Sequence, residues 1–299
     1  MWCFMRAWRR VRRGILYAAV GMIVVVSLAP VAWLFISSMS PDVELNSSTP
    51  HWIPQHPTTI RYRALFSEGA SDGLKALGPS MEHVAGDFRA AFRNSLVVVL
   101  SSTVASLALG VLAAYGLVRF SFPGRDALWF LSMGTRALPP ISLVIPLYLL
   151  LRQLDLLDTY YALILTYSAY LLPIVIWIMG NFFRTVPKEL EEAAVVDGCT
   201  PFGALWRVVI PLAGPGMAAA GIVCMLLAWD EFLFALIFTE TLASKTLPVA
   251  LSEFSTDFGG LDFGLIATGG TLMCLPPILI ALLFQRYLVS GLTGGAVKG

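Results

Sequence analysis

The chain alternates between long apolar runs and shorter polar connections. A helix that crosses a bilayer needs about 20 mostly apolar residues, and six runs meet this length. Their sequences are rich in Leu, Ile, Val and Ala and lack the period-two alternation of a membrane barrel, so helices are expected to satisfy the backbone in lipid. The pattern predicts an all-α integral membrane protein with six transmembrane helices, at residues 15–39, 95–118, 127–151, 160–181, 215–239 and 264–285.

Charge is almost absent from these runs. Of 20 basic and 19 acidic residues in the chain, only Arg136, Asp230 and Glu231 lie inside them. The 299 residues are 57% hydrophobic and 13% charged, whereas soluble domains carry about 25% charged residues. With a net charge of +1 and no basic face, the composition excludes a nucleic-acid partner, a disordered chain and a disulfide-stapled secreted domain.

The distribution of basic residues predicts the topology. Five arginines precede the first run, and the excess of Lys and Arg marks the cytoplasmic side. Both termini are therefore expected in the cytoplasm, as tails 1–14 and 286–299. A cleaved signal peptide is the alternative for the start, but the apolar run is longer than a signal h-region and lacks a clear small-x-small cleavage site.

The longest connection, 40–94, is expected to lie outside as a small cap or an irregular loop, with a short amphipathic helix around 82–93. It contains all three histidines, whose spacing fits no metal motif. The four cysteines form no C-x-x-C pair and are expected to be reduced thiols. P-loop, H-E-x-x-H and G-x-S-x-G motifs are absent. We expect neither an enzyme active site nor a metal or cofactor bound by this chain.

The most informative connection is residues 186–211. Its first part predicts a short helix over Glu189–Asp197, with acidic residues in the first turn, where they complement the helix dipole. Gly198 follows as a C-terminal stop. Thr200 is an expected N-cap with Pro201 at the first position of a second short helix, which Pro211 is expected to end.

This connection resembles the EAA loop of binding-protein-dependent ABC importer permeases. The residues that carry the resemblance are Glu192-Ala193-Ala194, Gly198 and Val208-Val209-Ile210-Pro211. The close departs from the family pattern only by Val for Ile and Ile for Leu. The resemblance implies a type I ABC importer permease (MetI-like) fold, with a permease core over 95–285 that contains the cytoplasmic coupling loop 186–211.

In that family the loop is a coupling helix that docks into a cytoplasmic ATPase. By resemblance, Glu192 pairs with a basic residue of the ATPase, the two alanines allow close approach, and Gly198 makes the turn. The coupling residues implied are Glu189, Glu192, Ala193, Ala194, Asp197, Gly198 and Phe202. ATP and Mg are then bound by the ATPase partner and not by this chain. A generic helical hairpin is the competing interpretation.

The C-terminal half resembles the maltose-type carbohydrate-uptake subfamily, and within it the MalG-like permease. The stretches that carry this are Trp229-Asp230-Glu231-Phe232, 245–249 and the ending 285–299. The resemblance implies that an external loop contacts a sugar-loaded binding protein, through Pro248, Glu253 and Phe254. It also implies that the tail contacts the ATPases, through Gly295, Ala296 and Lys298. An ordinary polar loop and a flexible Gly-rich end are the alternatives.

The three intramembrane charges are costly in lipid and should face protein or water. We hypothesise an ion pair between Arg136 and Asp230, with Glu231 beside it, that shapes or gates the pathway. A purely structural pair, or charges that line water separately, are equally open.

Taken with the resemblance, the sequence predicts a permease subunit of an ATP-driven importer in the bacterial inner membrane. Its cargo is expected to be a disaccharide or oligosaccharide delivered by an extracytoplasmic binding protein. The expected partners are a MalF-like second permease, two ATPase subunits, the sugar-binding protein and membrane lipid. Import of glycerol-3-phosphate or a polyol by the same architecture is the alternative. A secondary transporter would need a coupling-ion site, and a membrane scaffold would leave the 186–211 loop unexplained.

Overall fold

The computed structural model describes residues 2–47, 49, 51–66, 81–254 and 263–293, with side chains described outside 2–11, 81–85 and 286–293. The regular secondary structure of these residues is all helical, joined by turns and irregular segments. The chain divides into two compact units. Unit 1 comprises Met1–Gly86 and Glu253–Cys274, and unit 2 comprises Asp87–Ser252 and Leu275–Gly299.

The helices fall into long apolar elements and short connecting ones. The long elements are α1 (Trp2–Met39), α5 (Met81–Arg119), α8 (Tyr160–Thr185), α12 (Gly214–Trp229) and α15 (Phe263–Thr293). The others are α2 (Asp42–Leu45), α3 (Ile60–Phe66), α6 (Arg125–Gly134), η1 (Thr135–Ala137), α7 (Pro140–Gln153), α9 (Lys188–Val196), α10 (Pro201–Ala204), η2 (Leu205–Val209), α11 (Ile210–Leu212), α13 (Leu233–Phe238) and α14 (Leu247–Ser252).

Four of the described helices are long and apolar enough to cross a membrane: α1, α5, α8 and α15. Two further spans result if each of two bent helix pairs counts as one. One pair is α6–η1 with α7, bent by 100°, and the other is residues 201–212 with α12, bent by 76°. The spans predicted at 15–39, 95–118, 160–181 and 264–285 are confirmed as parts of single helices.

Two predicted spans are not continuous helices. The run 127–151 breaks at Leu138-Pro139, because a proline removes a backbone donor and restricts the residue before it. The run 215–239 breaks after Trp229, and α13 begins at Leu233. The prediction of one helix over 215–239 was therefore wrong. The acidic pair Asp230-Glu231 lies at this break.

The long connection 40–94 is partly helical. α2 and α3 fold within it, and the short helix expected around 82–93 is continuous with the following span in α5. The irregular-loop interpretation was thus wrong for these parts. Residues 67–80 lie outside the described structure.

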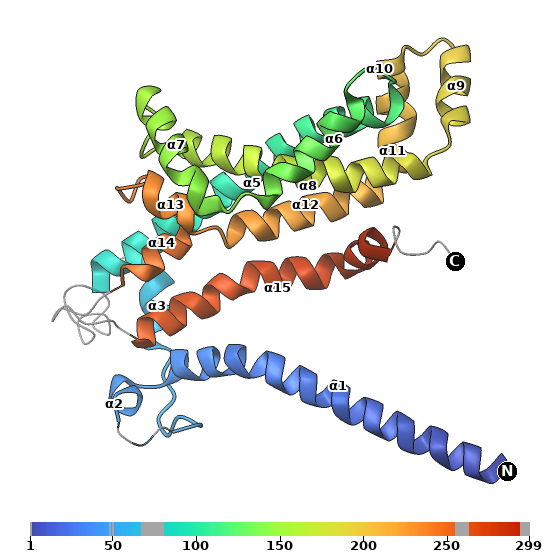
Figure 1. Ribbon diagram of the computed structural model, residues 1–299. Helices are drawn as coiled ribbons and strands as arrows, with labels where there is room; N and C mark the ends of the chain where they lie inside the picture. Colours follow the sequence, from blue (N-terminus) through green and yellow to red (C-terminus); the bar gives the residue numbers. More distant parts are fainter. Residues whose placement is uncertain (1, 48, 50, 67–80, 255–262, 294–299) are drawn as a thin grey trace. The chain divides into compact units, whose positions relative to one another are not determined.

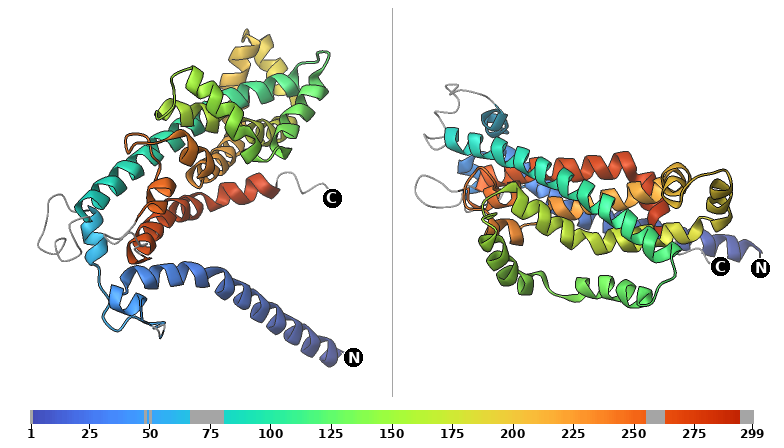
Figure 2. Two further views of the ribbon diagram at one scale, coloured as in Figure 1. Left: turned by 60° about the vertical axis from the view of Figure 1, so that its left-hand side comes forward. Right: turned by 90° about the horizontal axis from the view of Figure 1, so that it is seen from above.

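Unit 2 is organised around α8. Three neighbouring helices approach it at glycines, which let helix backbones come close in a membrane protein. Gly110 of α5 faces Val175 of α8, Trp129 of α6 covers Gly180 of α8, and Phe182 of α8 covers Gly216 of α12. A Cβ atom on any of these glycines would overlap the facing side chain. Figure 1 and Figure 2 show the result: α9 lies at one end of α8, and α13 and α14 lie toward the other.

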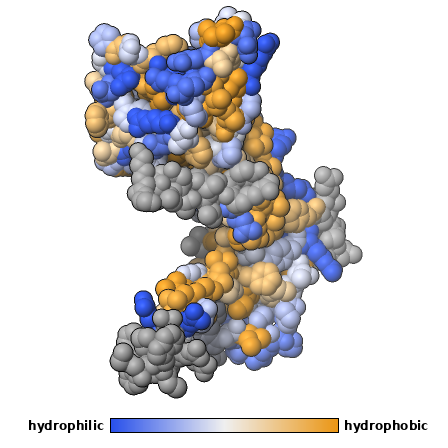
Figure 3. Space-filling model, turned by 90° about the vertical axis from the view of Figure 1, so that its right-hand side faces the viewer, coloured by the Kyte–Doolittle hydropathy of each residue, from blue (hydrophilic) through white to orange (hydrophobic). Residues whose placement is uncertain are grey.

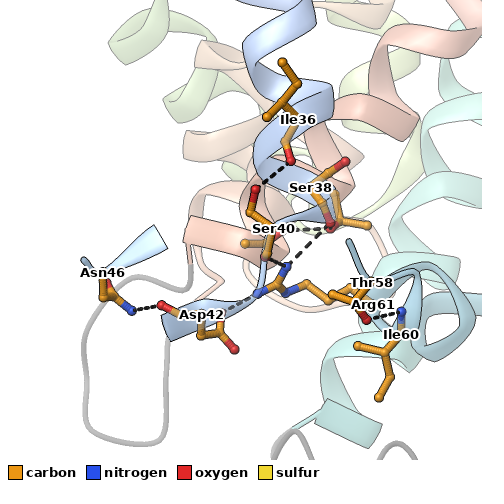
Figure 4. A network of polar contacts seen from close by, with 10 residues as sticks. Ile36, Ser38, Ser40, Asp42, Asn46, Thr58, Ile60 and Arg61 are labelled. Carbon is orange, nitrogen blue, oxygen red and sulfur yellow. Dashed lines mark hydrogen bonds and ion pairs between the residues drawn. The ribbon is translucent and has the colours of Figure 1, made fainter. Parts of the chain in front are cut away.

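Unit 1 contains a buried arginine. Arg61 of α3 is only 2% exposed and donates to the carbonyl oxygens of Ser40, at 2.7 Å, and Ser38, at 3.5 Å. Its guanidinium also forms an ion pair with Asp42, and Gly264 of α15 packs directly against it. Figure 4 shows the side chain reaching from α3 to the end of α1. Arg61 therefore satisfies carbonyl groups that the end of a helix leaves without partners.

Candidate functional site

The candidate site is the connection between α8 and α12. α9 begins after Pro187, with Glu189 and Glu191 in its first turn, and ends at Val196. Gly198 follows with a φ of +90°, a left-handed conformation that favours glycine. The N–H of Gly198 donates to Val195 O at 3.0 Å, and the next N–H, that of Cys199, donates to Ala194 O at 2.9 Å. This is the Schellman pattern, and it confirms the predicted glycine stop.

The second half of the connection restarts as predicted. The Thr200 hydroxyl accepts the N–H of Gly203 at 3.1 Å, and Pro201 occupies the first turn of α10. The helix does not end at Pro211, however. A π-helical turn, η2, leads into α11, which runs to Leu212. Since the π turn interrupts the regular bonding pattern, Pro211 falls in the first turn of a new segment, where its missing N–H is tolerated.

We call residues 188–212 the knob. Its outer surface mixes charge with large apolar groups: Phe202 is 60% and Trp206 54% exposed, with their rings edge to face at 6.1 Å. Figure 3 faces the end of the molecule that carries the knob and shows hydrophobic and hydrophilic residues side by side in its upper part. Exposed aromatic groups beside charges are typical of a protein-binding surface.

The predicted coupling residues differ in how far they are exposed to solvent. All but one of them are exposed: Glu189, Glu192, Ala193, Asp197, Gly198 and Phe202. Ala194 is buried, so of the two alanines only Ala193 is available to a partner.

Sequence reasoning missed one residue of the knob. The acidic residues of the first turn were assigned only to the helix dipole, but the carboxylate of one of them, Glu191, forms an ion pair with Arg119 of α5 at 2.5 Å. The hydroxyl of Tyr115, also in α5, donates to Glu191 at 3.1 Å. Tyr115 and Glu191 are 76 residues apart in the sequence, so no local pattern could pair them.

The intramembrane charges do not form the hypothesised ion pair. Arg136 lies in η1, with its guanidinium 4.1 Å from the centre of the Tyr170 ring and a 3.2 Å bond to Tyr170 O. Within the described residues no ion pair joins it to Asp230 or Glu231. The break between η1 and α7 turns the arginine toward α8, where cation–π and hydrogen-bond contacts satisfy it.

Glu231 has a local role instead. Its carboxylate accepts the N–H of Phe234 at 2.8 Å and that of Ala235 at 3.2 Å. These are first-turn N–H groups of α13, which lack partners within the helix, and a carboxylate is stabilised at this end. Asp230 stands at the C-cap of α12. Together the two residues explain the break in the predicted 215–239 helix.

The remaining predicted site residues lie in the C-terminal half of the chain. Pro248 is half-buried in α14, Glu253 is exposed, and Phe254 is buried at 4% exposure. Phe254 therefore presents little surface to a partner. The tail residues Gly295, Ala296 and Lys298 lie outside the described residues. Among the residues that the structure describes, no cluster of His, Cys, Asp and Glu could hold a metal ion.

Comparison with solved structures identifies the fold. The chain superposes on a chain of a bacterial ABC transporter involved in the import of the acidic polysaccharide alginate with a TM-score of 0.75, over 93% of this chain and 96% of that one, at 21% identity. The MetNI methionine ABC transporter gives a TM-score of 0.53 over 72% of this chain and 98% of that one, at 18% identity. The fold is that of a type I ABC importer permease.

Sequence comparison identifies the family. Residues 106–294 match the model of the "Binding-protein-dependent transport system inner membrane component", and the chain belongs to this family. It is 37% identical to the trehalose transport permease SugB of Mycobacterium tuberculosis, over 96% of this chain and 99% of that one. It is 34% identical to the sulfoquinovosyl glycerol transport permease SmoH of Agrobacterium fabrum, over 95% and 93%. It is 30% identical to the trehalose/maltose transport permease MalG of Thermococcus litoralis, over 96% and 98%. The chain is thus a multi-pass membrane permease of the carbohydrate-uptake type, and ATP hydrolysis belongs to a separate subunit of such a transporter.

Proposed function

We propose that this chain is one of two permease subunits of an importer that moves a disaccharide or another small glycoside across the bacterial inner membrane. A binding protein on the outer side delivers the cargo, and two cytoplasmic ATPase subunits drive its translocation. The trehalose, maltose and sulfoquinovosyl glycerol named for the relatives are all glycosides. That chemistry favours a sugar over glycerol-3-phosphate or a free polyol.

The observation that carries this proposal is the exposed surface of the knob. Glu192 offers a free carboxylate on the same short helix as Ala193, and Phe202 and Trp206 offer apolar area beside it. A rigid helical knob transmits force as a rigid-body movement. We infer that it inserts into a cleft of the ATPase subunit, with Glu192 facing a basic residue there.

The cargo is tested by uptake in a strain that lacks this chain, complemented with the wild-type gene. Radiolabelled trehalose and maltose are compared with labelled glycerol-3-phosphate. Restored uptake of a disaccharide, abolished when the binding protein is also deleted, supports the proposal. Restored uptake of glycerol-3-phosphate alone contradicts the sugar assignment.

The docking surface is tested by charge reversal. Glu192→Lys should abolish capture of the ATPase by the tagged permease, because like charges across an interface are repelled and unpaired. Asp126→Lys is the matched control, since its side chain is 80% exposed in α6, on the predicted cytoplasmic side. Capture and uptake at wild-type levels in Glu192→Lys, with both variants equally abundant in the membrane, would refute the assignment of the knob.

A further inference from the structure

The two consecutive glutamates of α9 face different surroundings. Glu192 is exposed, whereas the Glu191 side chain is 13% exposed and its partner Arg119 is 7% exposed. An ion pair this far from solvent is screened much less than a surface pair. The same turn of α9 therefore carries one exposed carboxylate, that of Glu192, and one that is nearly buried, that of Glu191.

The buried carboxylate is one of several points at which α5 holds this connection. Arg119 pairs with Glu191 and donates through Nη2 to Val186 O at 2.8 Å, just before α9. The Tyr115 hydroxyl lies 3.1 Å from Glu191 and 3.5 Å from Pro201 O, at the start of α10. Two side chains of α5 thus reach the segment before α9, α9 itself and the segment after it.

Tyr115 and Arg119 can act together because they are four residues apart, on one face of the last turns of α5. Tyr115 is itself held in place by edge-to-face contacts with Phe183 of α8 and with Phe120. The guanidinium supplies several donors in a fixed planar arrangement. These attachments oppose both rotation and sliding of α9 against α5.

The backbone alone would hold the knob less firmly. The knob contains a π-helical turn, and a 76° bend separates it from α12. Toward α8 it connects through Val186-Pro187. A π turn and a sharp bend both interrupt the regular hydrogen bonding that makes a helix continuous. A side-chain link from α9 to α5 therefore gives a push on the knob a second route, besides the chain itself, to a membrane-spanning helix.

We propose that Glu191, Arg119 and Tyr115 form a strut that makes α9 and the cytoplasmic end of α5 move as one body during transport. Glu191 is then a positioning residue for energy coupling, acting through α5 and not by contact with the ATPase. This inference rests on the proposed function. It separates two roles within one helical turn: Glu192 engages the partner, and Glu191 passes the movement on.

The first test is the ratio of cargo imported to ATP hydrolysed, measured on the full importer purified through a tag on this chain and reconstituted in vesicles. Glu191→Gln should capture the ATPase at wild-type levels yet lower the ratio by about two- to thirtyfold, the range for residues that carry coupling between sites. Tyr115→Phe should lower it less, because Arg119 still holds Glu191 and Val186. Lys188→Gln, at an exposed position of the same helix, is the control and should keep the wild-type ratio.

The second test measures the movement itself. Spin labels are placed at Val196, which is 87% exposed at the end of α9, and at Leu112, which is 42% exposed in α5, after the native cysteines are replaced by alanine. In the wild-type background the inter-spin distance should stay constant between the nucleotide-free and ATP-bound importer. With Glu191→Gln it should shift or broaden on ATP binding.

The outcomes are distinguishable. An unchanged ratio and an unchanged distance distribution in Glu191→Gln would overturn the strut. So would a lower yield of folded permease with a normal ratio, because Glu191 would then have only a structural role. Failure of the wild-type chain to capture any ATPase would instead overturn the proposed function.

Discussion

The carboxylate of Asp158 holds Thr241 by two bonds: the backbone N–H at 3.0 Å and the hydroxyl at 2.6 Å. It also accepts the N–H of Glu240 at 2.9 Å and the hydroxyl of Ser244. Asp158 itself stands at φ +57°, a conformation that Asp tolerates better than most residues. This single side chain therefore organises the turn between α13 and α14.

We expect Asp158→Ala to loosen this turn and Asp158→Asn to preserve most of it, because the amide oxygen still accepts hydrogen bonds. The turn leads into α14 and Glu253, on the predicted external side. Binding-protein-stimulated ATP hydrolysis should therefore weaken in the alanine variant and largely persist in the asparagine variant. Asp155→Ala is the control, since Asp155 shares the left-handed backbone at φ +52°. Equal stimulation in all three variants would contradict this role.

The same residue predicts a pH dependence. Partial burial alone raises the pKa of Asp158, but hydrogen bonds from Ser244, Thr241 and Glu240 outweigh it and lower the pKa to about 2, below the ordinary value for an aspartate. A carboxylate whose pKa is lower in the folded state than in the unfolded state stabilises the fold at pH values above the unfolded-state pKa. This contribution is lost as the pH falls through the folded-state pKa. The difference in melting temperature between wild type and Asp158→Ala should be constant from neutral pH to about 5 and shrink between about 4 and 2. A constant difference down to pH 2 would contradict it.

The contacts of Arg61 are expected to stabilise unit 1. Arg61→Ala should remove the guanidinium donor from the carbonyl of Ser40 and the carboxylate of Asp42, and leave the carbonyl of Ser38 with only the Thr268 hydroxyl. Hydrogen bonds to charged groups contribute about 1.5–3 kcal/mol each, so a fall of several degrees in the melting temperature in detergent is expected. Gly264→Ala should also lower it, because a Cβ atom would overlap the guanidinium. Arg63→Ala, outside this network on the same helix, should have little effect.

Glu231 separates a capping role from a gating role. Glu231→Gln removes the charge but keeps an oxygen that can accept an N–H of Phe234 or Ala235, whereas Glu231→Ala removes the acceptor. If the residue acts as a cap, the glutamine variant should transport nearly normally and the alanine variant should lose about 0.5–2 kcal/mol of stability. Loss of transport in Glu231→Gln at full stability would instead support the gating hypothesis.

The local features of the site could be predicted from the sequence and the distant ones could not. The stop at Gly198 and the cap at Thr200 follow from backbone chemistry within four residues, and both are confirmed. The pairing of Glu191 with Arg119 depends on how α5 packs beside the knob, which no sequence window contains. Arg136 was assigned the wrong contact for the same reason: an opposite charge was sought, and an aromatic ring and a carbonyl satisfy it.

Gly198 makes the turn between α9 and α10. At φ +90° a β-branched side chain is strained, at a cost of about 1–2 kcal/mol, and the Cys199 N–H would lose its alignment with Ala194 O. Gly198→Val should therefore change the angle between α9 and α10 and abolish ATPase capture while the membrane helices stay folded. Gly198→Asn is the matched control, because asparagine tolerates the left-handed region and nothing lies within 4 Å of a Cβ atom at this position. Retained capture in Gly198→Val would show that the partner does not require the observed turn. Equal loss in both variants would show that the partner requires a bare backbone at Gly198.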